Sequence, residues 1–90
     1  MQVIYKYELN EYMPVCEVLA PIIAPLRVDY QNGKPFLWAV VDTSQPDRLV
    51  RIHRVGTGFV LPGSVSISDH LNTTVQQSEP YVWHWFCEIR

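Results

Sequence analysis

The sequence predicts an all-β protein: a small antiparallel β-sandwich or a partly open barrel of six or seven strands, in one domain over residues 1–90. Asn32-Gly33 separates two apolar segments and indicates a two-residue hairpin turn, since Asn tolerates positive φ and Gly adopts it freely. Turn-forming residues recur about every 8–12 residues. Apolar residues nowhere follow helical spacing convincingly over about 11 residues, because Gly or Pro interrupts nearly every candidate segment.

The hairpin over residues 25–42 is the element around which we expect the sheets to form. On its first strand Leu26, Val28 and Tyr30 alternate with polar residues. One face of that strand should therefore be apolar, and the other should be polar and exposed to solvent. Residues 36–41 of its second strand are continuously apolar. We therefore expect that strand to lie centrally in a sheet and to be covered on both faces.

The N-terminal segment predicts two strands before the hairpin. Residues 3–9 alternate between apolar and polar types, as in a half-buried strand, and residues 15–19 form a short second strand. Residues 10–14 connect them. Pro21 and Pro25 lie too close together for a helix and favour an apolar corner. One helical turn within residues 10–24 is also compatible with the sequence.

The second half of the chain alternates between turns and strands. We expect breaks or turns at residues 43–47, 56–58, 61–64 and 78–80, a loop at 64–69, and strands at residues 48–55, 70–77 and 81–90. In the last strand Trp83, Trp85 and Cys87 share one face, while His84 and Phe86 share the other. That strand is therefore either central in its sheet or covered on one face by a partner subunit.

The core prediction follows from these strands. We expect eight side chains to be largely buried: Leu26, Val28, Trp38, Val40, Val50, Ile52, Val75 and Trp85. Cys16 and Cys87 are expected to be small buried hydrophobes rather than a disulfide pair, as is usual in a reducing compartment.

Composition narrows the function classes. A formal net charge of −2 gives no strong nucleic-acid signal, because phosphate binding usually requires a basic surface. No apolar run approaches the roughly 20 residues that span a bilayer. Residues 1–12 contain charges and tyrosines where a secretory signal has an apolar segment. We therefore expect an intracellular protein without membrane contact.

Several segments resemble one protein family. They are IYKYEL, NGKPFLWAVVD, RVGTGF, the LPG turn and the closing strand WHWFCEI. The pattern resembles a family of small uncharacterised proteins encoded by tailed bacteriophages and prophages, and it covers nearly the whole chain. Trp38, Asp42, residues 56–58 and His84 fall on the pattern of that family. The resemblance implies a phage protein in the cytoplasm of a bacterial host cell, but it implies no activity.

The sequence departs from that family at two places. Phe59 stands where the family usually has histidine, and residues 65–72 lack the usual Tyr-Ile-Gly. Any chemistry that the histidine serves in the family is therefore lost here.

No residue pattern indicates an enzyme or a cofactor. A phosphate loop at residues 56–58 would need further glycines and a following helix, so the end of a strand is the favoured interpretation. The three histidines and two cysteines lack the short spacing of zinc ligands. No nucleophile lies in a recognisable catalytic frame. We expect no catalytic residue and no metal.

Arginines and tryptophans are the candidate binding residues: Arg48, Arg51, Arg54, Trp83 and Trp85. On a strand, Arg48 and Arg54 share one face while Arg51 and His53 share the other. That splits the basic cluster, so a solvated edge strand is the favoured interpretation of residues 48–55, and a pair of arginines that binds phosphate or carboxylate is the functional alternative. The aromatic surplus favours self-association, most simply a homodimer through the last strand or an adjacent edge.

Three functions are compatible with these features. The first is a phage-encoded binding protein that inhibits a bacterial immune component, in the manner of an anti-CRISPR protein, with a host protein as its target. The second is an oligomer that binds a nucleotide immune signal between its subunits, with arginines contacting phosphate and aromatic rings contacting the base. The third is an accessory protein of the virion.

Overall fold

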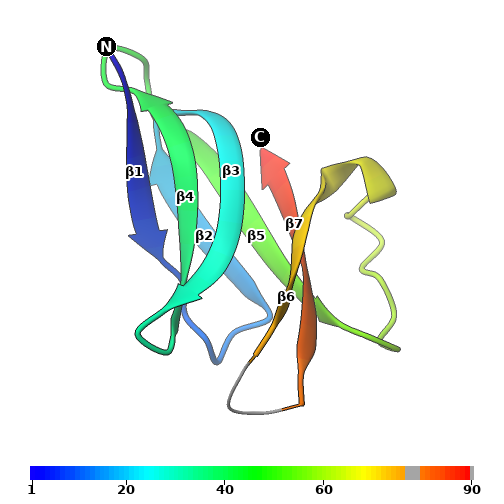
Figure 1. Ribbon diagram of the computed structural model, residues 1–90. Helices are drawn as coiled ribbons and strands as arrows, with labels where there is room; N and C mark the ends of the chain where they lie inside the picture. Colours follow the sequence, from blue (N-terminus) through cyan, green and yellow to red (C-terminus); the bar gives the residue numbers. More distant parts are fainter. Residues whose placement is uncertain (77–79, 90) are drawn as a thin grey trace.

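A computed structural model describes residues 1–76 and 80–89 of the chain (Figure 1). The elements in this part are β1 (Gln2–Glu8), β2 (Val15–Ala20), β3 (Ile22–Gln31), β4 (Lys34–Asp42), β5 (Arg48–Gly56), the 3₁₀ turn η1 (Ile67–Asp69), β6 (His70–Val75) and β7 (Val82–Ile89). The predicted all-β class is confirmed, and the 3₁₀ turn lies near residue 68 rather than within residues 10–24. No helix in the described part of the chain is long and apolar enough to span a membrane.

The strands form two antiparallel sheets that face each other. The first sheet has the order β1-β4-β3 and the second has the order β2-β5-β7-β6. Only Pro21 separates β2 from β3, so the chain passes from one sheet to the other at that residue. Apolar side chains of both sheets pack into one core, with Leu37 and Val28 from the first sheet and Ile52 and Trp85 from the second.

The hairpin prediction is confirmed. Asn32 and Gly33 have φ values of 54° and 79° and connect β3 to β4, with Gln31 paired to Lys34. The central position of β4 is confirmed as well, but its coverage on both faces is wrong. Leu37, Ala39 and Val41 are buried, whereas Trp38 and Val40 point outward and are only half-buried.

Two bulges overturn the predicted alternation along β3. The register shifts between Pro25 and Arg27, so Leu26 is the extra residue and is 46% exposed. The register shifts a second time between Ile22 and Ala24, so Ile23 is the extra residue of another bulge. The expected apolar corner at residues 21–25 is therefore the bulged start of β3. Pro25 is tolerated there because β3 is an edge strand.

In the second sheet β7 is central, as one of the two interpretations of its aromatic faces predicted. The interpretation of residues 48–55 as a solvated edge strand is wrong, because β5 lies between β2 and β7. Its His53 is buried, and the Nε2 atom lies 3.1 Å from the Glu88 carboxylate.

Val75 was expected in the core and is 67% exposed instead. The register of β6 shifts between His70 and Asn72, so Asn72 and Thr74 are the residues that face the core. Val28, Val50, Ile52 and Trp85 are buried as predicted. The predicted strand end at Gln77, the turn at residues 78–79 and the terminal Arg90 lie outside the described residues.

The two cysteines lie on the core side of the second sheet. Cys16 of β2 and Cys87 of β7 are both paired with Ile52 of β5, from opposite sides, and both are free thiols. Two strand spacings of about 4.8 Å each separate them, which is more than a disulfide can span. Burial, with a smaller contribution from Asp69, raises the pKa of the Cys87 thiol to about 11.

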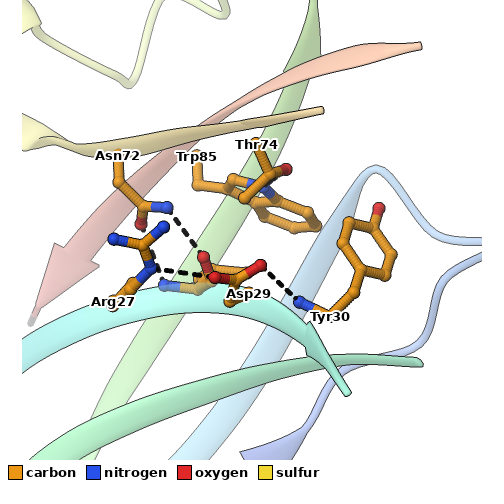
Figure 2. Close-up of polar contacts among 7 residues, drawn as sticks. Arg27, Asp29, Tyr30, Asn72, Thr74 and Trp85 are labelled. Carbon is orange, nitrogen blue, oxygen red and sulfur yellow. Dashed lines mark hydrogen bonds and ion pairs between the residues drawn. The ribbon is translucent and has the colours of Figure 1, made fainter. Parts of the chain in front are cut away.

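One side chain joins the edges of the two sheets. Asn72 of β6 accepts a hydrogen bond from the Val28 amide at 2.9 Å and donates one to the Val28 carbonyl at 2.7 Å. Figure 2 shows Asn72 beside Trp85, whose Nε1 donates to the Thr74 hydroxyl at 2.8 Å. Because Asn72 supplies both a donor and an acceptor, it replaces the main-chain partner that β3 lacks on this edge.

We expect Asn72→Ala to lower the free energy of unfolding by about 2–3 kcal/mol, since it leaves two partly buried main-chain groups of Val28 without partners. Urea denaturation measures the change. Asn10→Ala is the matched control, because it removes one hydrogen bond at an exposed connection and should cost less than about 1 kcal/mol. Equal losses in both variants would contradict the role assigned to Asn72.

Candidate binding surface around Arg54 and Trp83

Arg54 and Trp83 form a stacked pair at one end of the sandwich. In the register of β5 and β7, Arg54 is paired with Trp85 and Gly56 with Trp83, so Arg54 and Trp83 are diagonal neighbours on one face. The Arg54 guanidinium lies 4.2 Å from the centroid of the Trp83 ring. This distance is that of a cation–π contact.

The connection between β1 and β2 holds Arg54 in this position. The Arg54 Nη1 atom donates a hydrogen bond to the Glu11 carbonyl, and the Arg54 amide donates to the Pro14 carbonyl at 2.9 Å. The Nε atom is buried and has no hydrogen-bond partner among the described residues. Arg54 is thus fixed by main-chain groups, while part of its donor capacity stays unused.

Two hollows adjoin the Arg54–Trp83 pair, and Arg54 and Trp83 line both of them. The first has a volume of about 400 Å³ and the second of about 350 Å³. Besides the pair itself, the first is lined by Glu11, Tyr12, Tyr30, Gln76 and Tyr81, and the second by Pro14, Val55, Gly56, Phe59, Val60 and Pro62. We refer to all of these residues together as the Trp83 surface.

The first hollow combines aromatic rings with polar tips. Tyr81 packs against Trp83 with ring centroids 5.5 Å apart, and the Trp83 Nε1 atom donates to the Gln76 side chain at 3.1 Å. Burial raises the pKa of Tyr30, although the nearby Arg54 cation lowers it in part. The hollow can therefore accept a planar group and offer it both a cation and hydroxyl groups.

The second hollow is mainly apolar and depends on a glycine. A Cβ atom at Gly56 would lie 2.7 Å from the Phe59 ring, so the absence of a side chain lets Phe59 lie over the backbone. Phe59 is nevertheless 75% exposed and Val60 is 91% exposed. The segment at residues 56–58 ends β5 and turns the chain, as the favoured interpretation predicted.

A row of polar side chains lies on the opposite face of β7. The His84 Nε2 atom is 2.7 Å from the Thr57 hydroxyl, and its Nδ1 atom is 3.0 Å from the Thr73 hydroxyl. Thr73 also contacts the Nε2 atom of His70 at 3.1 Å. The described residues contain no group of three His, Cys, Asp or Glu side chains that could hold a metal ion.

The structure separates the five candidate binding residues. It brings Arg54 and Trp83 together. Arg48 is exposed at the start of β5, and Arg51 lies on the other face of β5, where it pairs with Glu17 at 3.5 Å. Trp85 is 2% exposed and supports the surface from inside the core.

Sequence reasoning missed the exposed rings of the surface. Tyr12 is 83% exposed in the connection between β1 and β2, and Phe59 follows the glycines after β5. The sequence feature that could have identified them is the presence of large apolar residues inside turns, where polar residues are usual.

The outer face of β7 is covered in part by its own chain. Val65, from the segment before η1, packs with Val55 and Phe86 in a second small core. This contact leaves less of that face for the self-association that the aromatic surplus predicted.

Comparison with known proteins identifies a family. The profile of a domain of unknown function, DUF7352, matches residues 1–90. The chain belongs to the DUF7352 family. No curated protein and no solved structure shows significant similarity to it.

Replacing Arg54 should change the titration of Tyr30. The Arg54 cation favours the phenolate, so Arg54→Gln should raise the pKa of Tyr30 further above its ordinary value. NMR titration with ring-labelled tyrosine measures the shift. Arg51→Gln is the matched control, because Arg51 lies on the other face of the same strand. An unchanged Tyr30 pKa in Arg54→Gln would contradict the proximity of the two side chains.

Proposed function

We propose that this protein acts by binding another macromolecule through the Trp83 surface, and that it is not an enzyme. The observation that carries the proposal is the Arg54 guanidinium stacked 4.2 Å from the Trp83 ring between two hollows. Tryptophan, tyrosine and arginine are the residues on which binding energy most often concentrates at interfaces. A guanidinium held by the Glu11 main-chain carbonyl also loses little conformational entropy when a partner binds.

The exposure of the neighbouring side chains supports the same proposal. Tyr12, Phe59 and Val60 are 83%, 75% and 91% exposed, and each lines one of the two hollows. Isolated exposed apolar residues are common, but a group gathered around concave sites marks a surface that a partner covers. Displacing water from these side chains would provide the hydrophobic part of the binding energy.

The partner that we propose is a host protein. In this proposal the chain is a phage-encoded protein of the bacterial cytoplasm that blocks a component of the host immune system. The support comes from the resemblance of IYKYEL, LWAVVD and VGTG to proteins of tailed phages and prophages. The mixture of apolar, aromatic and arginine side chains at the Trp83 surface fits the composition of protein–protein interface cores.

A nucleotide immune signal is the second candidate ligand. The first hollow favours it, because Tyr12, Tyr81 and Trp83 offer ring faces to a base and Arg54 offers a cation to a phosphate. Glu11 lines the same hollow, and its charge would oppose a phosphate close to it.

Phage challenge of bacteria that carry an active defence system tests the proposal. Expression of the wild-type protein should restore plating of a phage that the defence system restricts. Tyr12→Ser and Phe59→Ser should each weaken binding about thirtyfold, as for the loss of about 2 kcal/mol at an interface hot spot, and should reduce the rescue. Both positions are exposed, so the fold should tolerate these changes.

Ile67→Ser is the matched control. Ile67 is 84% exposed on η1 and lines neither hollow, so its replacement should leave the rescue unchanged. Equal rescue by all the variants would contradict the assignment of the surface. A rise in melting temperature with cyclic dinucleotides or ADP-ribose derivatives, lost in Arg54→Gln, would favour the nucleotide candidate instead.

A further inference from the structure

The two sheets have four edge strands, and three of them carry features that prevent pairing with another chain. β2 is six residues long and lies between Pro14 and Pro21. β3 contains Pro25 and two bulges. β6 has a bulge between His70 and Asn72, and the Asn72 side chain ties it to β3. Proline, bulges and coverage are the usual means by which proteins protect sheet edges.

β1 lacks these features. It spans Gln2–Glu8 without proline, glycine or a register shift, and it pairs with β4 through all seven of its residues. Figure 1 shows β1 at the margin of the first sheet, and no described strand pairs with its other edge. A long regular edge presents a row of main-chain donors and acceptors that a further strand can satisfy.

The side chains of β1 are unusually apolar for a free edge. Ile4 is 62% exposed and Tyr5 is 50% exposed. The two charged residues are paired within their own sheet, since Lys6 donates to the Gln31 side chain at 2.6 Å and Glu8 contacts Lys34 at 3.3 Å. The charge of Glu8 is therefore compensated within the sheet by Lys34. Lys6 keeps its charge, because Gln31 is neutral, and that charge limits the registers in which a second strand can approach.

We propose that β1 pairs with β1 of a second copy of this chain, antiparallel and about a two-fold axis at Ile4. The first sheet then continues across the axis as six strands. Ile4 faces Ile4 of the second copy, Val3 faces Tyr5, and Gln2 faces Lys6. On the outer face, Ile4 and its neighbour Val40 form one apolar row with their counterparts.

Charge and residue type favour this register over two-fold axes at Tyr5 and Lys6. An axis at Lys6 would place two ammonium groups opposite each other. An axis at Tyr5 would place Lys6 opposite Ile4 and diagonal to the Lys6 of the second copy. The axis at Ile4 places Ile4 opposite Ile4 of the second copy and Val3 opposite Tyr5, and no like charges face each other. A strand that complements itself in this way fits a second copy as its partner.

This interface is separate from the Trp83 surface, because no residue of β1 lines either of the two hollows beside Trp83. A dimer formed through β1 would therefore carry two copies of that surface. The result of the following test does not depend on whether the Trp83 surface binds a host protein.

Light scattering at micromolar concentration should give twice the 10.5 kDa mass of one chain. Ile4→Glu places two carboxylates opposite each other and should give the mass of one chain. Leu19→Glu is the matched control, because Leu19 is 67% exposed on the β2 edge, and this variant should remain a dimer. A wild-type monomer, or equal dissociation by both variants, would overturn the proposal.

Oxidative cross-linking tests the register in a Cys16→Ser background. Ile4→Cys should form a disulfide-linked dimer, since facing residues of antiparallel strands lie within disulfide range. Tyr5→Cys should not, because the two Tyr5 positions are offset along the strands by more than a disulfide spans. Leu19→Cys controls for random collision. Cross-linking of Tyr5→Cys in place of Ile4→Cys would overturn the register.

Discussion

The hydrogen bonds between Asn72 and the main chain of Val28 hold the sandwich together on one side. The two sheets share no ladder at this point, and β3 and β6 are joined by one amide side chain from a residue 44 positions away. Once β6 is fixed there, Thr74 can accept the hydrogen bond of Trp85, and the Trp85 ring meets Tyr30 edge-on at 6.5 Å. Tyr30 in turn lines the hollow beside Arg54, so Trp85 and Tyr30 connect this contact to one wall of the Trp83 surface.

The sequence predicted correctly those parts of the fold that depend on neighbouring residues in the chain. Asn32-Gly33 specifies its own turn, and the alternation in residues 82–89 correctly assigned the two faces of β7. The errors at Leu26 and Val75 share one cause. Leu26 is the extra residue of one bulge and Val75 follows another. The position of a bulge depends on the pairing partner, and a bulge exchanges the faces of the later residues in its strand.

The binding surface was only partly predictable. Residue type selected Arg54 and Trp83, but the same argument selected Trp85, which is buried, and Arg51, which pairs with Glu17. Sequence could not separate them, because it did not show which ends of β5 and β7 meet the connection at residues 10–14. The exposed rings of Tyr12 and Phe59 lie in turns, where the pattern of strand faces gives no prediction.

Amide hydrogen exchange at Val28 tests the central claim, that one side chain closes the sandwich at this edge. The Val28 amide has a side-chain partner, Asn72, so its protection depends on that contact alone. We expect slow exchange at the Val28 amide, comparable with that of core amides in β4 and β5. Such amides exchange only when a larger part of the structure unfolds. Exchange at the rate of an unprotected peptide, while β4 and β5 stay protected, would contradict the account.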